Sequence, residues 1–386
     1  MATPRVPHIP SRLPKVGTTI FTVMSALATE CAAVNLGQGF PDFDCDRRLI
    51  DHVSAAMLEG HNQYPPMPGL PALREAVAAK IELLYGRRYD PLGEITITAG
   101  ATQAILTAVL CCVGPGDEVI VLEPSYDSYA PNIELAGGVV VRVPLTPRTF
   151  RPDIAAIAAA LSPRTRAIIV NTPHNPTATV WSRAEWQQLA ALLVATDVVL
   201  ISDEVYEHMV YDGAAHVSAS TLPELAARSF VISSFGKTFH VTGWKVGTVA
   251  APIPLTAEFR KVHQFNVFTV NTPMQHGLAR YLADPEPYLG LPAFYQRKRD
   301  LFVEGLKSTR LKPLHTAGTY FQCVDYREVS DLDEAAFCQW LTREVGVAAI
   351  PLSAFYDGGF EQGIVRLCFA KKDETLRLAL QRLMRL

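Results

Sequence analysis

The chain has 386 residues, of which 49% are hydrophobic and 19% are charged, so it can bury a large core in two or three domains of roughly 150 residues. The formal net charge of −3 and the lack of any Lys/Arg run argue against a nucleic-acid partner. No apolar stretch approaches the ~18 residues of a membrane-spanning helix, so we expect a small-molecule partner and no membrane.

The N-terminal segment loosely imitates a secretory signal peptide. Basic residues precede an apolar run at residues 20–28 that ends in Ala-Leu-Ala. Threonine and serine interrupt this run, however, and its larger apolar side chains fit one face of an amphipathic helix. These side chains are Phe21, Met24, Leu27 and Ala28. We therefore predict a helix here rather than a leader.

The seven cysteines are an odd number and include no C-x-x-C pair. They match neither a disulfide framework nor a zinc site. We expect a reduced, cytoplasmic protein without a metal centre.

From about residue 94 to residue 250, short β-branched runs alternate with Ala- and Leu-rich segments. Strands are expected at residues 94–98, 118–122, 139–143, 167–170, 198–201, 230–233 and 246–250. Helices are expected between them, for example at residues 103–112 and 184–195. Continuous apolar runs are typical of strands buried on both faces, and the alternation predicts a mostly parallel sheet sandwiched by helices.

The pattern changes after about residue 285. Elements are expected at residues 294–306 (helix), 320–324 (strand), 335–344 (helix), 347–350 and 365–369 (strands), and from Asp373 (helix). This order predicts a smaller α+β domain. The expected fold class is α/β, with a large domain at residues 40–285 and a small domain built from residues 1–39 and 286–386.

In an open α/β sheet, ligands bind beyond the carboxyl ends of the strands. After the first predicted strand, Ala101 and Thr102 open a helix whose N-terminal amides suit an anion, although a simple well-packed helix start is an equally good interpretation. Asp203 follows the strand at residues 198–201, where an isolated carboxylate is more commonly a helix cap. Lys237 follows the strand at residues 230–233.

Gly236, Lys237 and Thr238 resemble the end of a nucleotide-binding phosphate loop, but that motif requires glycine where this chain has Val231. What remains is a lysine, and lysine can form a Schiff base with a carbonyl group. A lone lysine at a strand end is usually a solvated surface residue. Here the anion site, the carboxylate and the lysine meet at one sheet edge, which favours an aldehyde cofactor that carries a phosphate.

Eight segments then follow one another in order. They cover residues 35–43, 62–64, 99–102, 124–129, 171–176, 203–206, 233–245 and 365–369. Together they resemble the fold-type I, pyridoxal-phosphate-dependent aminotransferases of class I/II, over nearly the whole chain. Within that family the chain resembles the bacterial methionine aminotransferase branch, with kynurenine aminotransferases as more distant relatives. Lysine at position 245, where many members have arginine, fits this branch.

The resemblance implies a role for each cofactor-binding residue. Lys237 would bind pyridoxal 5'-phosphate covalently and move the proton, and Asp203 would pair with the pyridine nitrogen. Tyr206 and Asn175 would hydrogen-bond the phenolic oxygen, and Tyr126 would stack on the ring. The phosphate contacts would be Ala101, Thr102, Ser234, Lys245 and, from the partner subunit of a homodimer, Tyr64.

The resemblance also implies how substrate binds. Arg366 would bind the α-carboxylate through two parallel hydrogen bonds, assisted by Asn175 and Gly39. The side chain would meet aromatic rings, which favour methionine or an aromatic amino acid. These rings are Phe21, Phe355 and, across the dimer, Phe268. The implied function is ping-pong transfer of an amino group from an L-amino acid to a 2-oxo acid. Alternatives on the same cofactor are kynurenine aminotransferase and cysteine-S-conjugate β-lyase activity.

Overall fold

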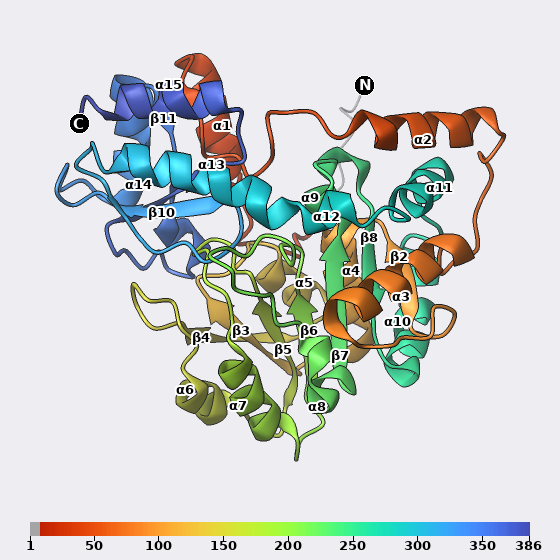
Figure 1. The fold of residues 1–386 in the computed structure, drawn as a ribbon. Coiled ribbons are helices and arrows are strands. Elements are labelled where there is room, and N and C mark those ends of the chain that lie inside the picture. The colour runs from red at the N-terminus through yellow and green to blue at the C-terminus, as the bar shows by residue number, and fades with distance from the viewer. Residues whose placement is uncertain (1–7) are drawn as a thin grey trace, which may run out of the picture.

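The computed structural model describes residues 8–386, which form a seven-stranded sheet, a four-stranded sheet and a two-stranded sheet with helices around them (Figure 1). The large sheet has the strand order β2-β8-β7-β6-β5-β3-β4. Its strands are β2 (Ile95–Thr98), β3 (Glu118–Glu123), β4 (Val139–Pro144), β5 (Thr165–Asn171), β6 (Val199–Asp203), β7 (Ser229–Ser234) and β8 (Gly247–Ala250). All the strands predicted between residues 94 and 250 are confirmed, with boundaries that differ by a residue or two.

The direction of the strands decides which residues share an edge of the large sheet. Strands β3 to β7 run parallel, which confirms the prediction, whereas β8 runs antiparallel to both β2 and β7. An apolar run has the same pattern in either direction, so no local pattern indicates this reversal. Because of it, the start of β8 lies beside the carboxyl ends of β2 and β7.

Both faces of the large sheet are buried. Ile168 and Leu200 belong to one hydrophobic core, while Ile169 and Ile201, on alternate positions of the same strands, belong to another. The second core is covered by helices α4 (Gly100–Cys112), α5 (Tyr129–Leu135) and α10 (Ile253–Asn266). The first core is covered by α3 (Pro71–Tyr85), α6 (Ile154–Ala160), α7 (Arg183–Leu193) and α8 (Pro223–Ala226). This sandwich confirms the α/β expectation.

The four-stranded sheet lies beside the large one, with the C-terminal helices around it (Figure 1). Its strands, in spatial order, are β12 (Ile350–Pro351), β13 (Ile364–Cys368), β10 (Phe321–Asp325) and β9 (Lys312–Pro313). The helices of this region are α13 (Leu291–Leu306), α14 (Glu334–Trp340) and α15 (Asp373–Leu383). The remaining longer helices, α2 (Arg47–Leu58) and α11 (Thr272–Tyr281), pack against each other beside the large sheet.

One predicted strand of this region is present but divided in two. The segment at residues 347–350 splits into β11 (Val347–Ala348), which pairs with β1 (Val34–Asn35), and β12, which pairs with β13. The chain changes sheets at Ala349, and a continuous apolar run contains no signal for such a change.

The predicted N-terminal helix is confirmed as α1 (Ile20–Glu30), which buries Met24, Leu27 and Ala28. It packs against β11, α14 and β12, and β1 pairs with β11, so the segment at residues 20–35 joins the C-terminal elements. The domain division at residues 39 and 285 stays a prediction, and its first seven residues lie outside the described part of the chain. None of the helices in residues 8–386 has the length and hydropathy needed to cross a membrane.

Candidate active site

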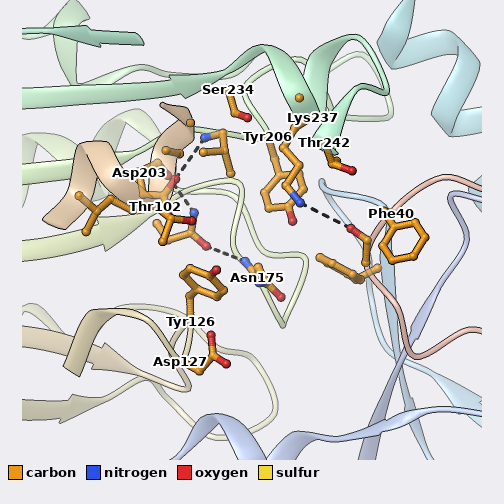
Figure 2. Close-up of a pocket in the computed structure, with 18 of the residues that line it drawn as sticks. Phe40, Thr102, Tyr126, Asp127, Asn175, Asp203, Tyr206, Ser234, Lys237 and Thr242 are labelled. Carbon is orange, nitrogen blue, oxygen red and sulfur yellow. Dashed lines mark hydrogen bonds between the residues drawn. The ribbon is translucent and has the colours of Figure 1, made fainter. Parts of the chain in front are cut away.

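A cavity of about 340 Å³ lies where β5, β6 and β7 end and where α4 begins (Figure 2). Most of the predicted site residues line it, although they come from distant parts of the chain. These are Phe21, Gly39, Ala101, Thr102, Tyr126, Asn175, Asp203, Tyr206, Ser234, Lys237, Lys245 and Arg366. The side chains expected to act together therefore share one space.

One end of the cavity is shaped to accept an anion. Gly247, the first residue of β8, pairs with both Thr98 and Ser234, which brings β8 against the start of α4. A Cβ atom at Gly247 would lie 3.1 Å from the backbone nitrogen of Ala101, and one at Gly100 would lie 3.3 Å from Cε of Lys245. A Cβ at Gly247 would also lie 2.8 Å from the carbonyl oxygen of Ser233, so glycine at this position lets β8 pack closely against the start of α4. The first-turn amides of a helix have no intrahelical acceptor, so they are available to an anion there.

Lys237 lies on the short helix α9 (Phe235–Thr238), directly after β7. Its Nζ donates a hydrogen bond to the Tyr320 hydroxyl at 3.2 Å. A longer contact of 3.5 Å joins Nζ to the carbonyl oxygen of Gly39, and it is the dashed line that leaves Lys237 in Figure 2. Burial disfavours the charged ammonium and lowers the pKa of Lys237 to about 8. A sizeable fraction of this amine is therefore neutral near physiological pH.

Asp203 ends β6 and is buried in the cavity wall. Its Oδ2 accepts a hydrogen bond from the Tyr129 hydroxyl at 2.6 Å, and its Oδ1 accepts one from the backbone amide of Val205 at 3.3 Å. Both partners are neutral, and burial raises the pKa of Asp203 to about 6. A buried carboxylate with only neutral partners suits a cation.

Arg366 lies on β13 and is 1% exposed. Its guanidinium donates to Oδ1 of Asn175 at 2.7 Å and to the carbonyl oxygen of Gly37 at 3.0 Å, while Nε has no partner in residues 8–386. The rings of Phe321, Phe355 and Phe21 surround it at 4.0, 5.0 and 5.4 Å from Cζ. A buried cation with an unused donor and no anionic partner suits a carboxylate ligand.

The residues present therefore fit a phosphate-bearing aldehyde with a cationic ring nitrogen. The anion end, the amine of Lys237 and the carboxylate of Asp203 supply the three complementary groups. Arg366 supplies a fourth group, for a carboxylate.

Comparison with known proteins decides the family. The family model described as aminotransferase class I and II matches residues 32–383. The chain belongs to the class I and II aminotransferases. It is therefore a transaminase of a family that uses pyridoxal phosphate, as the sequence motifs had predicted.

Individual aminotransferases match along almost their full length. The chain is 54% identical over 382 residues to methionine aminotransferase of Escherichia coli (strain K12), covering 98% of this chain and 99% of the relative. It is 43% identical over 385 residues to a probable N-succinyldiaminopimelate aminotransferase of Mycobacterium tuberculosis, covering 97% of each. It is 38% identical over 400 residues to kynurenine–oxoglutarate transaminase 3 of Mus musculus, covering 95% and 88%.

The fold agrees with that of solved aminotransferases. The crystal structure of YbdL from Escherichia coli, for which a methionine aminotransferase function was identified, superposes with a TM-score of 0.97. The two chains are 53% identical, and the match covers 99% of this chain and 100% of that one. The predicted fold class is confirmed.

Three predicted residues do not line the cavity of this aminotransferase. Phe355 is buried behind the wall, where it packs on Phe21 and Arg366. Its predicted contact with the substrate side chain stays a prediction. Tyr64 and Phe268 are exposed and pack edge-to-face, with ring centroids 5.3 Å apart. Their assignment to the active site of a partner subunit stays a prediction.

Other residues of the site were not singled out by sequence reasoning. Tyr129 donates a hydrogen bond to Asp203, and Tyr320 accepts one from Lys237. Thr242 and Asp127 also line the cavity, and Asp127 is an exposed carboxylate. Three of these residues lie inside the family motifs at residues 124–129 and 233–245, namely Asp127, Tyr129 and Thr242. Their place in those motifs could have identified them as site residues. Tyr320 is the first residue of the strand predicted at residues 320–324, and nothing in that apolar pattern signalled a role in the site.

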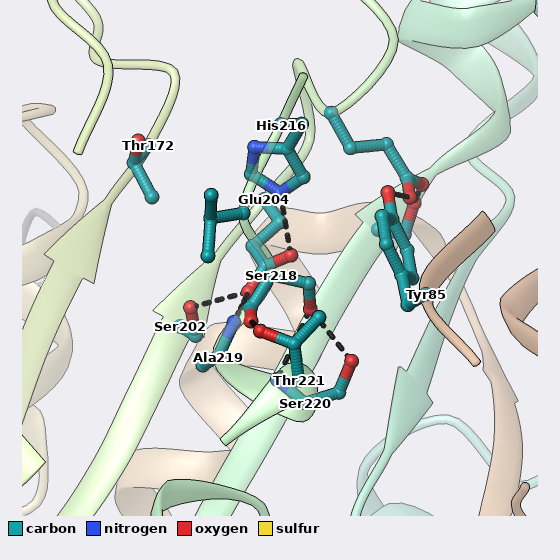
Figure 3. Close-up of polar contacts among 12 residues, drawn as sticks. Tyr85, Thr172, Ser202, Glu204, His216, Ser218, Ala219, Ser220 and Thr221 are labelled. Carbon is teal, nitrogen blue, oxygen red and sulfur yellow. Dashed lines mark hydrogen bonds and ion pairs between the residues drawn. The ribbon is translucent and has the colours of Figure 1, made fainter. Parts of the chain in front are cut away.

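A buried hydrogen-bond network on the side of β6 away from the cavity holds the turn that follows this strand, at residues 204–208 (Figure 3). Glu204 follows Asp203 and points away from the cavity, where its carboxylate accepts hydrogen bonds from Ser202 at 2.8 Å and from the amide of Ala219 at 3.0 Å. Its other oxygen lies 2.8 Å from Nε2 of His216. The side chain therefore ties the end of β6 to the loop that follows the turn.

Glu207 anchors the same turn to helix α3. Its carboxylate accepts from the Lys80 ammonium at 2.6 Å, from the Tyr85 hydroxyl at 2.5 Å and from Ser233 on β7. Burial alone would raise the pKa of Glu207, but Lys80 and these hydrogen bonds outweigh burial and lower it. Such a carboxyl adds stability at neutral pH, and that contribution is lost as the pH falls toward its folded-state pKa.

Replacing Glu207 with glutamine is expected to lower the free energy of unfolding by about 3–5 kcal/mol, because it leaves the Lys80 ammonium buried without its partner. Urea unfolding at pH 7 measures the change. The double variant Lys80→Met/Glu207→Gln removes both charges and should recover much of the loss. A single variant as stable as the parent would contradict the anchoring role.

Proposed function

We propose that the chain is a pyridoxal-phosphate-dependent aminotransferase that moves the amino group of an L-amino acid to a 2-oxo acid by a ping-pong mechanism. One observation carries the proposal. The buried Asp203 carboxylate and the buried Arg366 guanidinium have only neutral partners, and they line one cavity with the amine of Lys237. Each of these buried charges would be stabilised by a ligand group of opposite sign.

Specific residues would hold the cofactor. Asp203 would pair with the protonated ring nitrogen, Tyr126 would stack on the ring, and Tyr206 and Asn175 would hydrogen-bond the phenolic oxygen. The phosphate would be held by the amides of Ala101 and Thr102 and by the side chains of Ser234, Lys245 and Thr242. When bound, the cofactor supplies an electron-accepting ring that stabilises the charge left on the substrate Cα atom.

Lys237 would hold the cofactor covalently and, once free, would take the Cα proton on its Nζ. A base must be neutral to accept a proton, and burial places the pKa of Lys237 near the working pH, at about 8. Asp203 would have a different role: its negative charge would keep the ring nitrogen of the cofactor protonated.

Arg366 would bind the α-carboxylate of both the amino acid and the oxo acid. Replacing it with lysine keeps the charge but removes the planar pair of donors. We expect kcat/KM to fall about 100-fold for all substrates alike, a loss of about 2–3 kcal/mol in line with a charged hydrogen bond. Steady-state kinetics with two amino acids of different size measure it. A fall confined to one substrate would contradict a role at the shared carboxylate.

We further propose methionine or an aromatic amino acid as the favoured donor. Phe21 and Phe321 line the cavity next to the Arg366 guanidinium, and Phe40 and Tyr126 also line its wall. Sulfur and aromatic rings attract one another, and within residues 8–386 no second arginine lines the cavity to bind an acidic side chain. The names of the methionine and kynurenine relatives support the same choice.

A panel of half-reactions tests the proposal. The purified, cofactor-loaded protein is mixed with single amino acids, and oxo-acid formation is measured. Methionine, phenylalanine and tyrosine are expected to react faster than aspartate and glutamate. Pyruvate and ammonia from a cysteine S-conjugate, without oxo-acid formation from methionine, would favour the β-lyase alternative. A faster reaction with an acidic donor would contradict the substrate class.

The proposed assembly is a homodimer with shared active sites. Tyr64 is 80% exposed and Phe268 is 47% exposed, and such a paired aromatic surface suits contact with a second copy. Tyr64 would reach the phosphate in the partner, and Phe268 its substrate pocket. Light scattering should give the mass of two chains.

We also propose a cytoplasmic location, supported by the seven cysteines, all of which are free.

A further inference from the structure

The hydroxyl group of Tyr320 lies between Lys237 and the N-terminal segment. Tyr320 is fully buried just before β10, and its hydroxyl donates to the carbonyl oxygen of Gly39 at 2.6 Å. A phenol has one proton to donate. Because that proton points to Gly39, the hydroxyl faces Lys237 as an acceptor, at 3.2 Å from Nζ.

We propose that Tyr320 is a positioning residue for Lys237, holding the free amine at the wall of the cavity in the orientation from which it exchanges the Cα proton. This inference rests on the proposed function. It assigns Tyr320 no contact with substrate or cofactor, so the residue acts through the protein groups that its side chain touches, among which Lys237 is the one that moves the proton.

The surroundings of Tyr320 make it suited to this role. Its ring packs against Phe321, Tyr206 and Tyr295, with centroids 4.9, 5.2 and 5.8 Å away. The hydroxyl is therefore fixed in place. A lysine side chain has several rotatable bonds, and the other acceptor near Nζ, Gly39, is at the long distance of 3.5 Å. Without Tyr320, the amine would spend less time in one orientation, and proximity contributes strongly to rate.

The contact also affects the charge of Lys237. An acceptor stabilises the ammonium form and so opposes the effect of burial, which lowers the pKa. The other groups that act on this amine are Asp203 and Cys368, which raise its pKa, and Arg366 and Lys245, which lower it. Replacing Tyr320 with phenylalanine leaves all of them in place.

A matched pair of variants isolates the hydroxyl group. Tyr320→Phe removes it, and Tyr295→Phe removes the hydroxyl of an equally buried neighbour that has no hydrogen-bond partner in residues 8–386. Acylation of Lys237 in the full-length, cofactor-free protein is followed against pH by mass spectrometry. We expect the parent and Tyr295→Phe to share one midpoint near pH 8, and Tyr320→Phe to label at a midpoint lower by about half a pH unit or more.

The cofactor-loaded proteins give a second measurement. In single turnovers with methionine, Tyr320→Phe is expected to slow proton transfer about tenfold while the amino-acid Kd changes less than about twofold. Tyr295→Phe should match the parent. If Tyr320→Phe does not fold, Tyr320→His takes its place. Its ring retains an acceptor for Nζ, so the variant should keep part of the parent's rate.

Equal labelling midpoints and equal rates for the two phenylalanine variants would overturn the proposal. Labelling requires no cofactor, so its outcome does not depend on whether the chain is a methionine or an aromatic aminotransferase. Failure of the proposed function would show instead as a cofactor-loaded parent that forms no oxo acid from any amino acid.

Discussion

Replacing Lys237 with alanine is expected to abolish transamination, lowering the rate of the amino-acid half-reaction by about four orders of magnitude. The variant loses both the covalent anchor proposed for the cofactor and the base that takes the Cα proton. Lys245 cannot substitute for it, because its amine lies against Gly100 at the anion end of the cavity. The visible absorption of the bound cofactor and the single-turnover rate with methionine measure the two losses separately.

Two further lysine variants make this result specific. Lys237→Arg keeps a cation but has no amine that can become neutral, so it should be as inactive as Lys237→Ala. Lys261 pairs with Glu258 on the exposed side of α10, and Lys261→Ala should behave like the parent. Normal turnover and an unchanged spectrum for Lys237→Ala would remove Lys237 from the mechanism.

Replacing Asp203 with asparagine is expected to slow proton abstraction about a thousandfold. Asparagine has the same shape and can still accept the Tyr129 hydrogen bond, so the change removes mainly the charge. Loss of a buried charge partner costs about 4 kcal/mol, which corresponds to three factors of ten in rate. Cα-deuterated methionine identifies the slowed step, since its isotope effect should grow in the variant.

Tyr129→Phe provides the control for Asp203. It removes the neutral hydrogen bond at 2.6 Å but leaves the carboxylate, so its rate should stay within about tenfold of the parent. A near-normal rate in Asp203→Asn would mean that the ring nitrogen does not depend on this charge.

Much of the site could be predicted because chemistry in an α/β sheet gathers at strand ends. Asp203 and Ser234 are the last residues of β6 and β7, and Lys237 follows within one turn. Strand positions can be predicted from local apolar patterns, and a correctly predicted strand end also locates the residues that follow it. The family motifs added the distant partner Arg366, which no local pattern connects to Asn175.

What could not be predicted depends on contacts between distant segments. Tyr320 reaches Lys237 and Gly39 only because β10 packs beside the large sheet, and Lys80 meets Glu207 only in the folded chain. The split at Ala349 and the inward position of Phe355 have the same cause. Each is decided by tertiary packing, which a short window of sequence does not contain.

The reversed direction of β8 has a consequence for how the protein matures. In residues 8–386, β2 is an edge strand whose neighbour is β8, the last strand of its sheet to be synthesised. The anion end forms only when β2 and β8, the first and last strands of this sheet along the chain, have paired. A nascent chain that has not yet reached β8 should therefore be unable to bind the cofactor. Once bound, the cofactor would fasten the first and last strands together and protect the edge from fraying.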